Sequence, residues 1–469
     1  MTDSFHMTPD EFREHGHRMV DWVADYLANV EQHPVISPVT PGEIRAALPS
    51  SAPEQPEPFE NVIADLNTVI MPGITHWQSP NWFSYFPANS SGPSLLGEMA
   101  TAGLGVQGML WSTSPAATEL EMVVVDWLVD LLGLPAQWKT TGPGGGVIQM
   151  SASDSTHVAL VTARELATAH HPLDKLVVYA SDQTHSSVEK GARIAGYSQV
   201  RMVPTDREFA IDVAALEAAI AADRAQGLIP AAVVASVGTT ATTAVDPVRR
   251  VAEVAGREGM WCHVDAAYAG SAMICPEHRH HQDGLELVDS YTFNPHKWMF
   301  TNFDCNLYYV ADRRPLIEAM SILPPYLRNE ATLSGEVIDY RDWHVPLGRR
   351  FRSLKLWFVL RHYGAVGIRH HIREHIRLAA ELAERIASDP RFELVAPAPF
   401  ALVVFRHVAG NEATADLAAA LNQSGKVAVT PTTVNETVAL RVSIGQTNTT
   451  AEHVDRLWTM IDALAGGSS

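Results

Sequence analysis

Apolar residues recur at helical spacing near the start of the chain. From Phe12 onward they fall three or four positions apart, which predicts a helix with one apolar stripe. The helix should begin after Thr8, because Pro9 suits the first helical position and Glu11 completes a capping box. The proline-rich stretch "ALPSSAPEQPEPFE" then predicts an extended connector. We expect such a helix to pack on something other than its sequence neighbours, with a second subunit as the candidate.

The middle of the chain alternates short β-rich runs with helical segments. The runs are "KLVVYAS", "QVRMVPT", "AAVVASVG", "MWCHVDA" and "DSYTFN", and helix-like segments such as "DVAALEAAIAADRAQG" separate several of them. This alternation predicts an α/β domain whose mostly parallel sheet is covered by helices on both faces. In such sheets ligands bind at the carboxyl ends of the strands.

A long amphipathic stretch, "RRFRSLKLWFVLRHYG", predicts a helix that bridges to a smaller C-terminal α+β domain. That domain contains the strand-like runs "RFELVAPAPFALVVFR" and "ETVALRVSIG" and ends in a helix after Thr450. The predicted division is a helical N-terminal dimerisation segment at 1–90, a large domain at 91–354 and a small domain at 355–469.

Composition and charge narrow the function classes. The chain has 469 residues, of which 46% are apolar and 19% charged, as expected of a well-packed globular protein. Acidic residues outnumber basic ones by 53 to 34, so the net charge of −19 disfavours nucleic acid or an acidic membrane as a partner.

Three cysteines, none in a C-x-x-C pair, build no disulfide framework and fit a reducing cytoplasm. No stretch is apolar over the ~18 residues that a membrane span needs, and the N-terminus lacks the pattern of a signal peptide. We therefore expect a cytoplasmic protein without a membrane segment. No metal site is predicted.

A glycine-rich stretch, "TGPGGGVIQMSASDST", leads into a predicted helix. Its glycines permit tight turns, and Ser151, Ala152 and Ser153 would open the helix with free N–H groups and hydroxyls beside them. Such a helix start suits a phosphate group. Taken alone, a glycine-rich loop is more often only a turn.

Two polar residues follow predicted strands. His185 comes after "KLVVYA", where it could stack on a ligand, although a lone histidine is more often a capping or core residue. Asp265 ends the strand "WCHVD", where it could cap a helix or hold a positive charge on a bound ring.

Lys297 lies between His296 and Trp298, at the end of a strand-like run. Most lysines extend their amine into water, but burial lowers the pKa of a lysine, and the neutral amine is the nucleophile that forms a Schiff base. The chain thus contains four candidate parts of one site: a helix start suited to a phosphate, a histidine that could stack on a ring, a carboxylate and an amine. A Schiff-base lysine with an acidic partner for the pyridinium nitrogen is the mark of pyridoxal phosphate.

Several longer motifs carry a family resemblance. The stretches "NPHKW", "HVDAAYAGSA", "THSSVEK", "PLGRRFRSLKLWF" and "MPGITHWQSPNWFSYFPANSS" closely resemble those of the pyridoxal-phosphate-dependent aromatic L-amino acid decarboxylases. The resemblance runs from about Thr8 to the C-terminal helix and implies the aspartate-aminotransferase-like fold. It also implies a homodimer whose active sites are shared between the subunits.

The resemblance assigns roles to the residues already singled out. It implies that Lys297 holds the cofactor covalently, that His185 lies over its ring and that Asp265 faces the pyridine nitrogen. The phosphate would be bound by the following residues, with His296 beside the lysine: Ser151, Ala152, Ser153, Thr240 and Asn294. Whether Thr239 shares the role of Thr240 stays open.

The implied activity is decarboxylation of tryptophan, tyrosine, phenylalanine or dihydroxyphenylalanine to the arylalkylamine and carbon dioxide. Tyr326 matches the family's loop tyrosine that protonates Cα after carbon dioxide leaves. Some relatives are instead oxygen-consuming aldehyde synthases, which typically replace this tyrosine with phenylalanine or the stacking histidine with asparagine; both are kept here. A relative without activity that serves as a scaffold is the remaining alternative, and the intact set of Lys297, Asp265 and His185 argues against it.

The resemblance also implies a substrate pocket lined by aromatic residues. The matching positions are Trp77, Tyr85, Phe86 and Pro87, with Gln107, Met109 and Gly348 also matching pocket positions. In the family, the positions of Gln107 and Met109 reach the pocket of the neighbouring subunit. Glycine at the position of Gly348 goes with indole substrates in plant relatives, which favours tryptophan-like substrates only weakly. The stretch "HWQSPNWFSYFPANSS" offers no cation for the distal carboxylate of glutamate.

Overall fold

A seven-stranded sheet forms the centre of the computed structural model, which describes residues 5–322 and 337–466. Its strands run in the order β1-β7-β6-β5-β4-β2-β3, and only β7 is antiparallel to its neighbours. The strands are β1 (Gly145–Gln149), β2 (Leu176–Ser181), β3 (Gln199–Val203), β4 (Ile229–Ser236), β5 (Trp261–Asp265), β6 (Ser290–Phe293) and β7 (Asn306–Val310). The mostly parallel sheet predicted from the sequence is confirmed.

The sheet is buried on both faces. Along β4, Val233 packs in one hydrophobic cluster and Val234 in another, since neighbouring side chains of a strand point to opposite faces. The helices around this sheet are α5 (Pro115–Leu132), α6 (Ala152–Thr168), α7 (Ser187–Ile194), α8 (Val213–Ala225), α9 (Val248–Glu258), α10 (Pro295–Trp298) and α11 (Arg313–Met320). The strand ends that bear polar residues are therefore held by a rigid, two-sided core.

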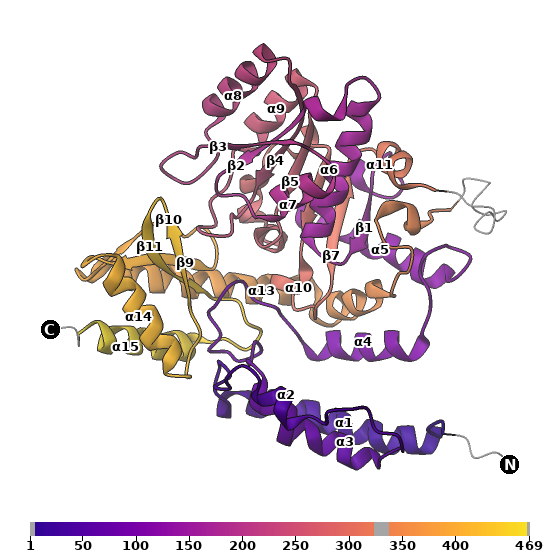
Figure 1. The fold of residues 1–469 in the computed structure, drawn as a ribbon, viewed down its shortest axis with the longest axis vertical. Helices are drawn as coiled ribbons and strands as arrows, with labels where there is room; N and C mark the ends of the chain where they lie inside the picture. The colour runs from indigo at the N-terminus through magenta and orange to yellow at the C-terminus, as the bar shows by residue number, and fades with distance from the viewer. Residues whose placement is uncertain (1–4, 323–336, 467–469) are drawn as a thin grey trace.

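A second, four-stranded antiparallel sheet lies towards the C-terminus, in the order β10-β11-β9-β8 (Figure 1). Its strands are β8 (Phe392–Leu394), β9 (Leu402–His407), β10 (Thr430–Val434) and β11 (Thr437–Ser443). Helices α14 (Asn411–Gln423) and α15 (Ala451–Ala465) accompany it, and α13 (Arg352–Ser388) connects it to the rest of the chain. The predicted bridging helix and final helix are both present.

The N-terminal helices extend away from both sheets (Figure 1). They are α1 (Pro9–Asn29), α2 (Glu43–Ala47) and α3 (Phe59–Asp65), and α4 (Gly92–Leu104) follows them and packs on α13. The predicted capping box is present, because the Glu11 N–H donates to Thr8 Oγ1 at 3.3 Å and the Thr8 N–H donates to Glu11 Oε2 at 2.7 Å. Within this single chain, α1 buries none of its residues, and Phe12 is 60% exposed.

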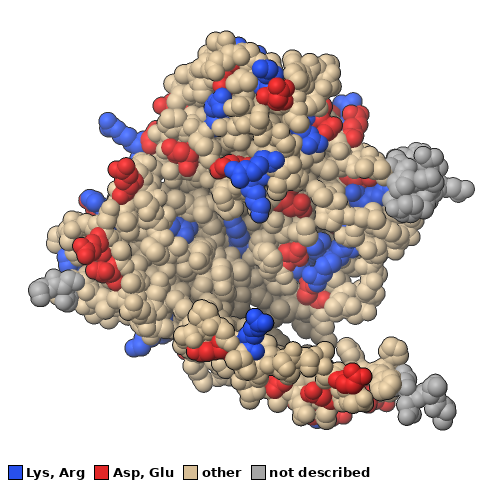
Figure 2. Space-filling model, in the orientation of Figure 1, with Lys and Arg blue, Asp and Glu red and all other residues tan. Residues whose placement is uncertain are grey.

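Charges of both signs are interspersed over the face drawn in Figure 2, without a continuous basic stripe. Within residues 5–322 and 337–466, no helix combines the length and the apolar character needed to cross a membrane.

Candidate active site

One cavity of about 200 Å³ lies where the carboxyl ends of β1, β2, β4, β5 and β6 meet. This is the edge at which parallel α/β sheets bind ligands. All nine residues predicted to contact a cofactor line it, namely Ser151, Ala152, Ser153, His185, Thr240, Asp265, Asn294, His296 and Lys297. The fold thus brings together side chains that come from five separate strand ends.

Lys297 is held in a short turn directly after β6. Asn294 caps α10, and the Lys297 N–H donates to the Asn294 carbonyl at 3.0 Å. On one side, His296 Nδ1 accepts the Cys305 N–H at 2.9 Å; on the other, Trp298 is fully buried. Because its neighbours are fixed by packing and hydrogen bonds, the lysine has a defined position in the lining of the cavity.

The amine of Lys297 forms no ion pair with any residue that the structure describes, and its Nζ lies 5.2 Å from the centre of the Phe86 ring. Burial lowers the pKa of Lys297, the negative charge of Asp265 opposes this shift, and the positive charge of Arg441 adds to it. Burial disfavours the ammonium form because the charge loses its hydration. The amine is therefore shifted towards its nucleophilic, neutral form.

Asp265 is the last residue of β5 and is 7% exposed. The register of the sheet places it between Ser236 at the end of β4 and Thr292 in β6. Its Oδ1 accepts the Ala267 N–H at 2.9 Å, which fixes the carboxylate at the wall of the cavity. A carboxylate held this way can stabilise a positive charge on a bound ring.

His185 follows β2 at the mouth of the cavity. Its Nδ1 accepts the Ser187 N–H at 3.1 Å, so in the neutral ring the proton is on Nε2. Partial burial lowers the pKa of His185, the Lys297 charge lowers it further, and Asp265 opposes both. A neutral imidazole at this position suits stacking on a planar ligand.

The start of α6 supplies hydrogen-bond donors to the cavity. Ser151 caps the helix by accepting the Asp154 N–H at 3.2 Å, which leaves the N–H groups of Ala152 and Ser153 at the first turn. Such a helix start favours an anion. Across the cavity, the buried Oδ1 of Asn294 has no hydrogen-bond partner among the described residues.

The loop after β4 contributes two threonines with different surroundings. Thr239 is buried, and its Oγ1 accepts the Ala244 N–H at 3.0 Å and lies 3.1 Å from Thr242 Oγ1. Thr240 is exposed at the cavity and has no such internal contact among the described residues. The hydroxyl of Thr240 is therefore the freer of the two, which supports Thr240 over Thr239 as a phosphate contact.

Five further residues line the cavity that sequence reasoning did not assign: Ser236, Gly238, Thr239, Ala267 and Tyr268. Tyr268 stacks on Phe86 with ring centres 4.0 Å apart and on Trp298 at 4.7 Å. Its position three residues after Asp265, in a run of small residues, is the signal that could have found it. The three rings form an aromatic wall beside Lys297.

Of the predicted substrate residues, only Phe86 lines this cavity within one chain. Trp77 and Tyr85 stack on each other just outside it, with ring centres 5.6 Å apart. Pro87 is buried beside Gly445, where an added Cβ would lie 2.8 Å from Pro87 Cγ.

Gln107 lies beside Gly348, because a Cβ added to Gly348 would be 3.4 Å from Gln107 Nε2. The Oε1 atom of Gln107 accepts the Arg349 N–H at 2.6 Å. Met109 is half-buried in the same loop, and its carbonyl accepts the Arg341 N–H at 3.1 Å. Gln107 and Met109 stay predictions that concern the pocket of a second subunit, and Gly348 stays a prediction about substrate preference. Tyr326 lies outside the described residues.

The aromatic segment is attached to the small sheet by backbone hydrogen bonds. The Phe83 N–H donates to the Ala428 carbonyl, and the Ser443 N–H donates to the Phe83 carbonyl, both at 2.9 Å. The Tyr85 N–H donates to Thr430 Oγ1 at 2.8 Å. Residues of the small sheet thus position the segment that carries Phe86.

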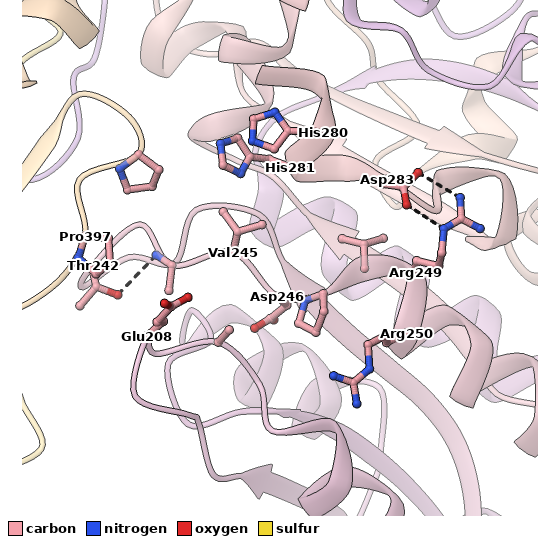
Figure 3. Close-up of a pocket in the computed structure, with 15 residues that line it drawn as sticks. Glu208, Thr242, Val245, Asp246, Arg249, Arg250, His280, His281, Asp283 and Pro397 are labelled. Carbon is pink, nitrogen blue, oxygen red and sulfur yellow. Dashed lines mark hydrogen bonds and ion pairs between the residues drawn. The ribbon is translucent and has the colours of Figure 1, made fainter. Parts of the chain in front are cut away.

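Figure 3 shows a larger cavity, of about 510 Å³, that is also lined by residues of the loop after β4. Thr242 and Asp246 of that loop line it, together with Glu208 and His281, and the Arg249 guanidinium turns to Asp283 at 2.7 Å. None of the predicted cofactor residues lines this cavity, and it contains no lysine amine. Size alone therefore does not identify the reactive site.

The donor set fits pyridoxal phosphate. The N–H groups at the start of α6 and the hydroxyl of Thr240 suit the phosphate, as would the amide N–H groups of Asn294. Asp265 suits a ring nitrogen, and Lys297 suits an aldehyde. Among the described residues, no group of three or more His, Cys, Asp or Glu side chains is placed to hold a metal ion.

Comparison with known proteins identifies the family. The pyridoxal-dependent decarboxylase conserved domain matches residues 41–408. The chain belongs to this decarboxylase family. As a pyridoxal-dependent decarboxylase, it is a carboxy-lyase that uses pyridoxal phosphate.

Tryptophan decarboxylase 2 of Oryza sativa subsp. japonica is 47% identical to this decarboxylase, covering 97% of this chain and 94% of its own length. Phenylacetaldehyde synthase of Arabidopsis thaliana is also 47% identical, covering 97% and 96%. The crystal structure of Oryza sativa TDC with PLP and tryptamine superposes with a TM-score of 0.97 at 41% identity and covers 99% of both chains. The expected fold of the family is thereby confirmed.

Proposed function

We propose that this decarboxylase converts aromatic L-amino acids, of the tryptophan, tyrosine, phenylalanine and dihydroxyphenylalanine class, to arylalkylamines and carbon dioxide. The observation that carries the proposal is the half-buried Lys297 amine, which has no ion-pair partner among the described residues and lies beside the stacked rings of Phe86 and Tyr268. Flat apolar surfaces of this kind suit an aromatic side chain. The segment from 76 to 90 contains no lysine or arginine that could bind a distal carboxylate.

Pyridoxal phosphate, when bound, supplies a ring that accepts the electron pair released as the carboxylate leaves. The residues of the chain set the conditions for that step. The carboxylate of Asp265 would face the ring nitrogen, and the amine of Lys297, whose pKa is lowered by burial, would attach the cofactor covalently. The aromatic wall and His185 orient the substrate and limit water near the reacting carbon, so positioning contributes to the rate.

Amine formation rather than aldehyde formation is the favoured outcome. Overall similarity does not distinguish the two activities, because the decarboxylase of Oryza sativa and the aldehyde synthase of Arabidopsis thaliana are both 47% identical to this chain. The two positions that typically differ in aldehyde synthases hold His185 and Tyr326 here. Both residues match the amine-forming pattern.

We also propose that the enzyme is a homodimer with shared active sites. The exposed apolar side chains of the N-terminal helices support this, because α1 to α3 bury none of their residues within one chain. Phe12 is 60% exposed, Val62 50% and, on α4, Leu96 56%. A second copy would cover such surfaces and bring Gln107 and Met109 towards a neighbouring cavity.

The proposed organisation follows the three segments 1–90, 91–354 and 355–469, and the proposed location is the cytoplasm. Cys262, Cys275 and Cys305 are all free and buried, which suits a reducing compartment. The net charge of −19 makes nucleic acids and acidic membranes poor partners.

The proposal is tested by incubating the purified enzyme, loaded with pyridoxal phosphate, with a panel of aromatic L-amino acids and with L-glutamate. Products are identified by mass, and hydrogen peroxide is measured in parallel. We expect amine and carbon dioxide in equal amounts from at least one aromatic substrate, without peroxide and without turnover of glutamate. Peroxide in proportion to product would favour the aldehyde synthase, and a colourless protein that takes up no cofactor would contradict both activities.

Replacing Tyr326 by phenylalanine should lower amine formation and produce the aldehyde instead. The physical reason is the loss of the hydroxyl proposed to deliver a proton to Cα, which leaves the carbanion open to oxygen. Amine, aldehyde and peroxide are measured for both proteins with the same substrate. An unchanged ratio of amine to aldehyde would remove Tyr326 from the protonation step.

A further inference from the structure

Arg441, in β11 of the small sheet, is a buried cation with no acidic partner in the part of the chain that the structure describes. It is 4% exposed, and no carboxylate among the described residues forms an ion pair with it. Burial lowers the pKa of Arg441 to about 10, so the guanidinium still carries its charge at neutral pH. Removing a cation from water costs several kcal/mol unless other interactions offset it. The position of this side chain therefore requires an explanation.

The contacts of Arg441 all lie at the edge of the active site. Its Nε donates to the Ala241 carbonyl in the loop after β4 at 3.2 Å, and a terminal nitrogen lies 3.5 Å from the Tyr85 carbonyl. The guanidinium carbon lies 5.1 Å from the centre of the Phe86 ring. One side chain thus connects the cofactor loop with the aromatic substrate segment.

Tyr85 has a backbone conformation that needs such support. Its φ is 54°, in the left-handed region that side chains other than glycine rarely adopt and that costs on the order of 1 kcal/mol. Thr430 accepts its N–H at 2.8 Å, and Arg441 is within reach of its carbonyl. The two polar groups of the Tyr85 backbone are therefore held by adjacent strands of the small sheet, since Thr430 and Arg441 are partners in the β10–β11 pair.

The Phe86 ring brings the two cations together: Lys297 Nζ lies 5.2 Å and the Arg441 guanidinium carbon 5.1 Å from its centre, so they are at most about 10 Å apart. At such a separation, the positive charge of Arg441 lowers the pKa of Lys297. Four charged or titratable groups act on the Lys297 amine or are acted on by it: Asp265, His185, His296 and Arg441. The two histidines are shifted towards their neutral forms, and Asp265 favours the ammonium form. Arg441 is the nearby permanent positive charge that opposes Asp265.

We propose that Arg441 is a positioning residue of the active site, which holds the Tyr85–Phe86 turn against the cofactor loop and keeps a positive charge near the Lys297 amine. The first role sets the shape of the substrate pocket. The second favours the neutral amine that captures the cofactor aldehyde. The part that concerns substrate affinity rests on the proposed function, whereas the part that concerns Lys297 rests only on the cofactor.

The charge role is tested with Arg441→Met and Arg441→Lys, alongside Arg406→Met as a matched control from the same small sheet. Arg406 forms only a surface ion pair with Glu393. The measured quantity is the rate at which each apoprotein captures pyridoxal phosphate, followed by absorbance as a function of pH. Without the positive charge, the ammonium form of Lys297 is favoured. The pH at which Arg441→Met reaches half of its maximal capture rate, called the capture midpoint, should therefore be higher than in the wild type. Arg441→Lys and Arg406→Met should keep the wild-type midpoint.

The turn role is tested by the KM for an aromatic amino acid that the wild-type enzyme decarboxylates. Arg441→Met and Thr430→Val should each raise this KM between about two- and tenfold, the effect of one lost hydrogen bond. Thr430→Val removes an acceptor from Tyr85 but leaves the charge of Arg441, so its capture midpoint should stay at the wild-type pH. If the wild type decarboxylates no aromatic amino acid, the proposed function fails, while the capture midpoint still decides the charge role.

A folded Arg441→Met protein with wild-type midpoint and wild-type KM would overturn the proposal. Circular dichroism and the melting temperature establish whether the variant is folded. Should Arg441→Met not fold, Arg441→Gln replaces it, since its amide retains a hydrogen-bond donor but no charge. If the pH midpoint of cofactor capture in Arg441→Gln equals that of the wild type, Arg441 does not act on Lys297 through its charge. If Thr430→Val has the wild-type KM, the hydrogen bonds to the Tyr85 backbone do not shape the substrate pocket.

Discussion

Replacing Lys297 by alanine should reduce amine formation by at least ~10⁴-fold, which corresponds to about 5 kcal/mol of barrier. The variant lacks the cavity amine whose pKa is lowered, so the cofactor has no point of covalent attachment. Product is measured by mass, and borohydride reduction followed by peptide mapping reports whether the cofactor is fixed to the chain. We expect the reduced cofactor on Lys297 in the wild type and none in the variant.

Lys175→Ala serves as the matched control. Lys175 is exposed and lies next to the amino end of β2, on the opposite edge of the sheet, so its loss should leave turnover and cofactor attachment unchanged. Lys297→Arg, which keeps a positive charge but not the reactive amine, should be as inactive as Lys297→Ala. Turnover of Lys297→Ala within tenfold of the wild type would contradict the assignment of this lysine.

Replacing Asp265 by alanine should lower the rate by about 10³-fold, since each power of ten corresponds to about 1.4 kcal/mol. The carboxylate ends β5 at the cavity wall, where its charge is placed to keep a ring nitrogen protonated. The rate is measured at saturating cofactor and substrate, so that weaker binding is not mistaken for slower chemistry.

Asp265→Asn separates charge from geometry. Its amide oxygen can still accept the Ala267 N–H, which Asp265 Oδ1 now accepts at 2.9 Å, so the local turn should persist without the negative charge. A loss close to that of Asp265→Ala is expected, whereas Asp130→Asn, in an exposed ion pair with Lys139, should have no effect. If the rate of Asp265→Ala falls less than tenfold, the carboxylate is not the partner of the ring.

Most strands that carry the site can be predicted from the sequence, because the residues within each run are enough to indicate a strand. The runs that became β2 and β4 are almost entirely apolar, and those of β5 and β6 contain aromatic and β-branched residues, as expected of buried strands. β1 was not predicted, since Gly145 and Gly146 at its start indicate a turn, and β7 follows the Lys297 turn without a signal of its own. Both are stabilised by pairing with each other, a contact between distant parts of the chain.

The site residues also divide into those indicated by their local sequence and those placed by contacts between distant parts of the chain. Asp265, His185 and Lys297 could be predicted because each follows a recognisable strand, and parallel strands end at a common edge. Arg441 and Thr430 could not, because their strands belong to another sheet, which reaches the edge of the cavity only by packing against the aromatic segment and the loop after β4.

The backbone hydrogen bonds that join Phe83 to Ala428 and Ser443 have a consequence for protein engineering. In a chimaera that takes only the aromatic stretch from a relative, this stretch would have to form its backbone hydrogen bonds with the small-sheet residues of the other protein. We expect the hydrogen-bond register to change and Phe86 to be misplaced. Specificity should transfer between homologues when the stretch around 76–90 is exchanged together with its supporting strands at 428–445, as a single cassette.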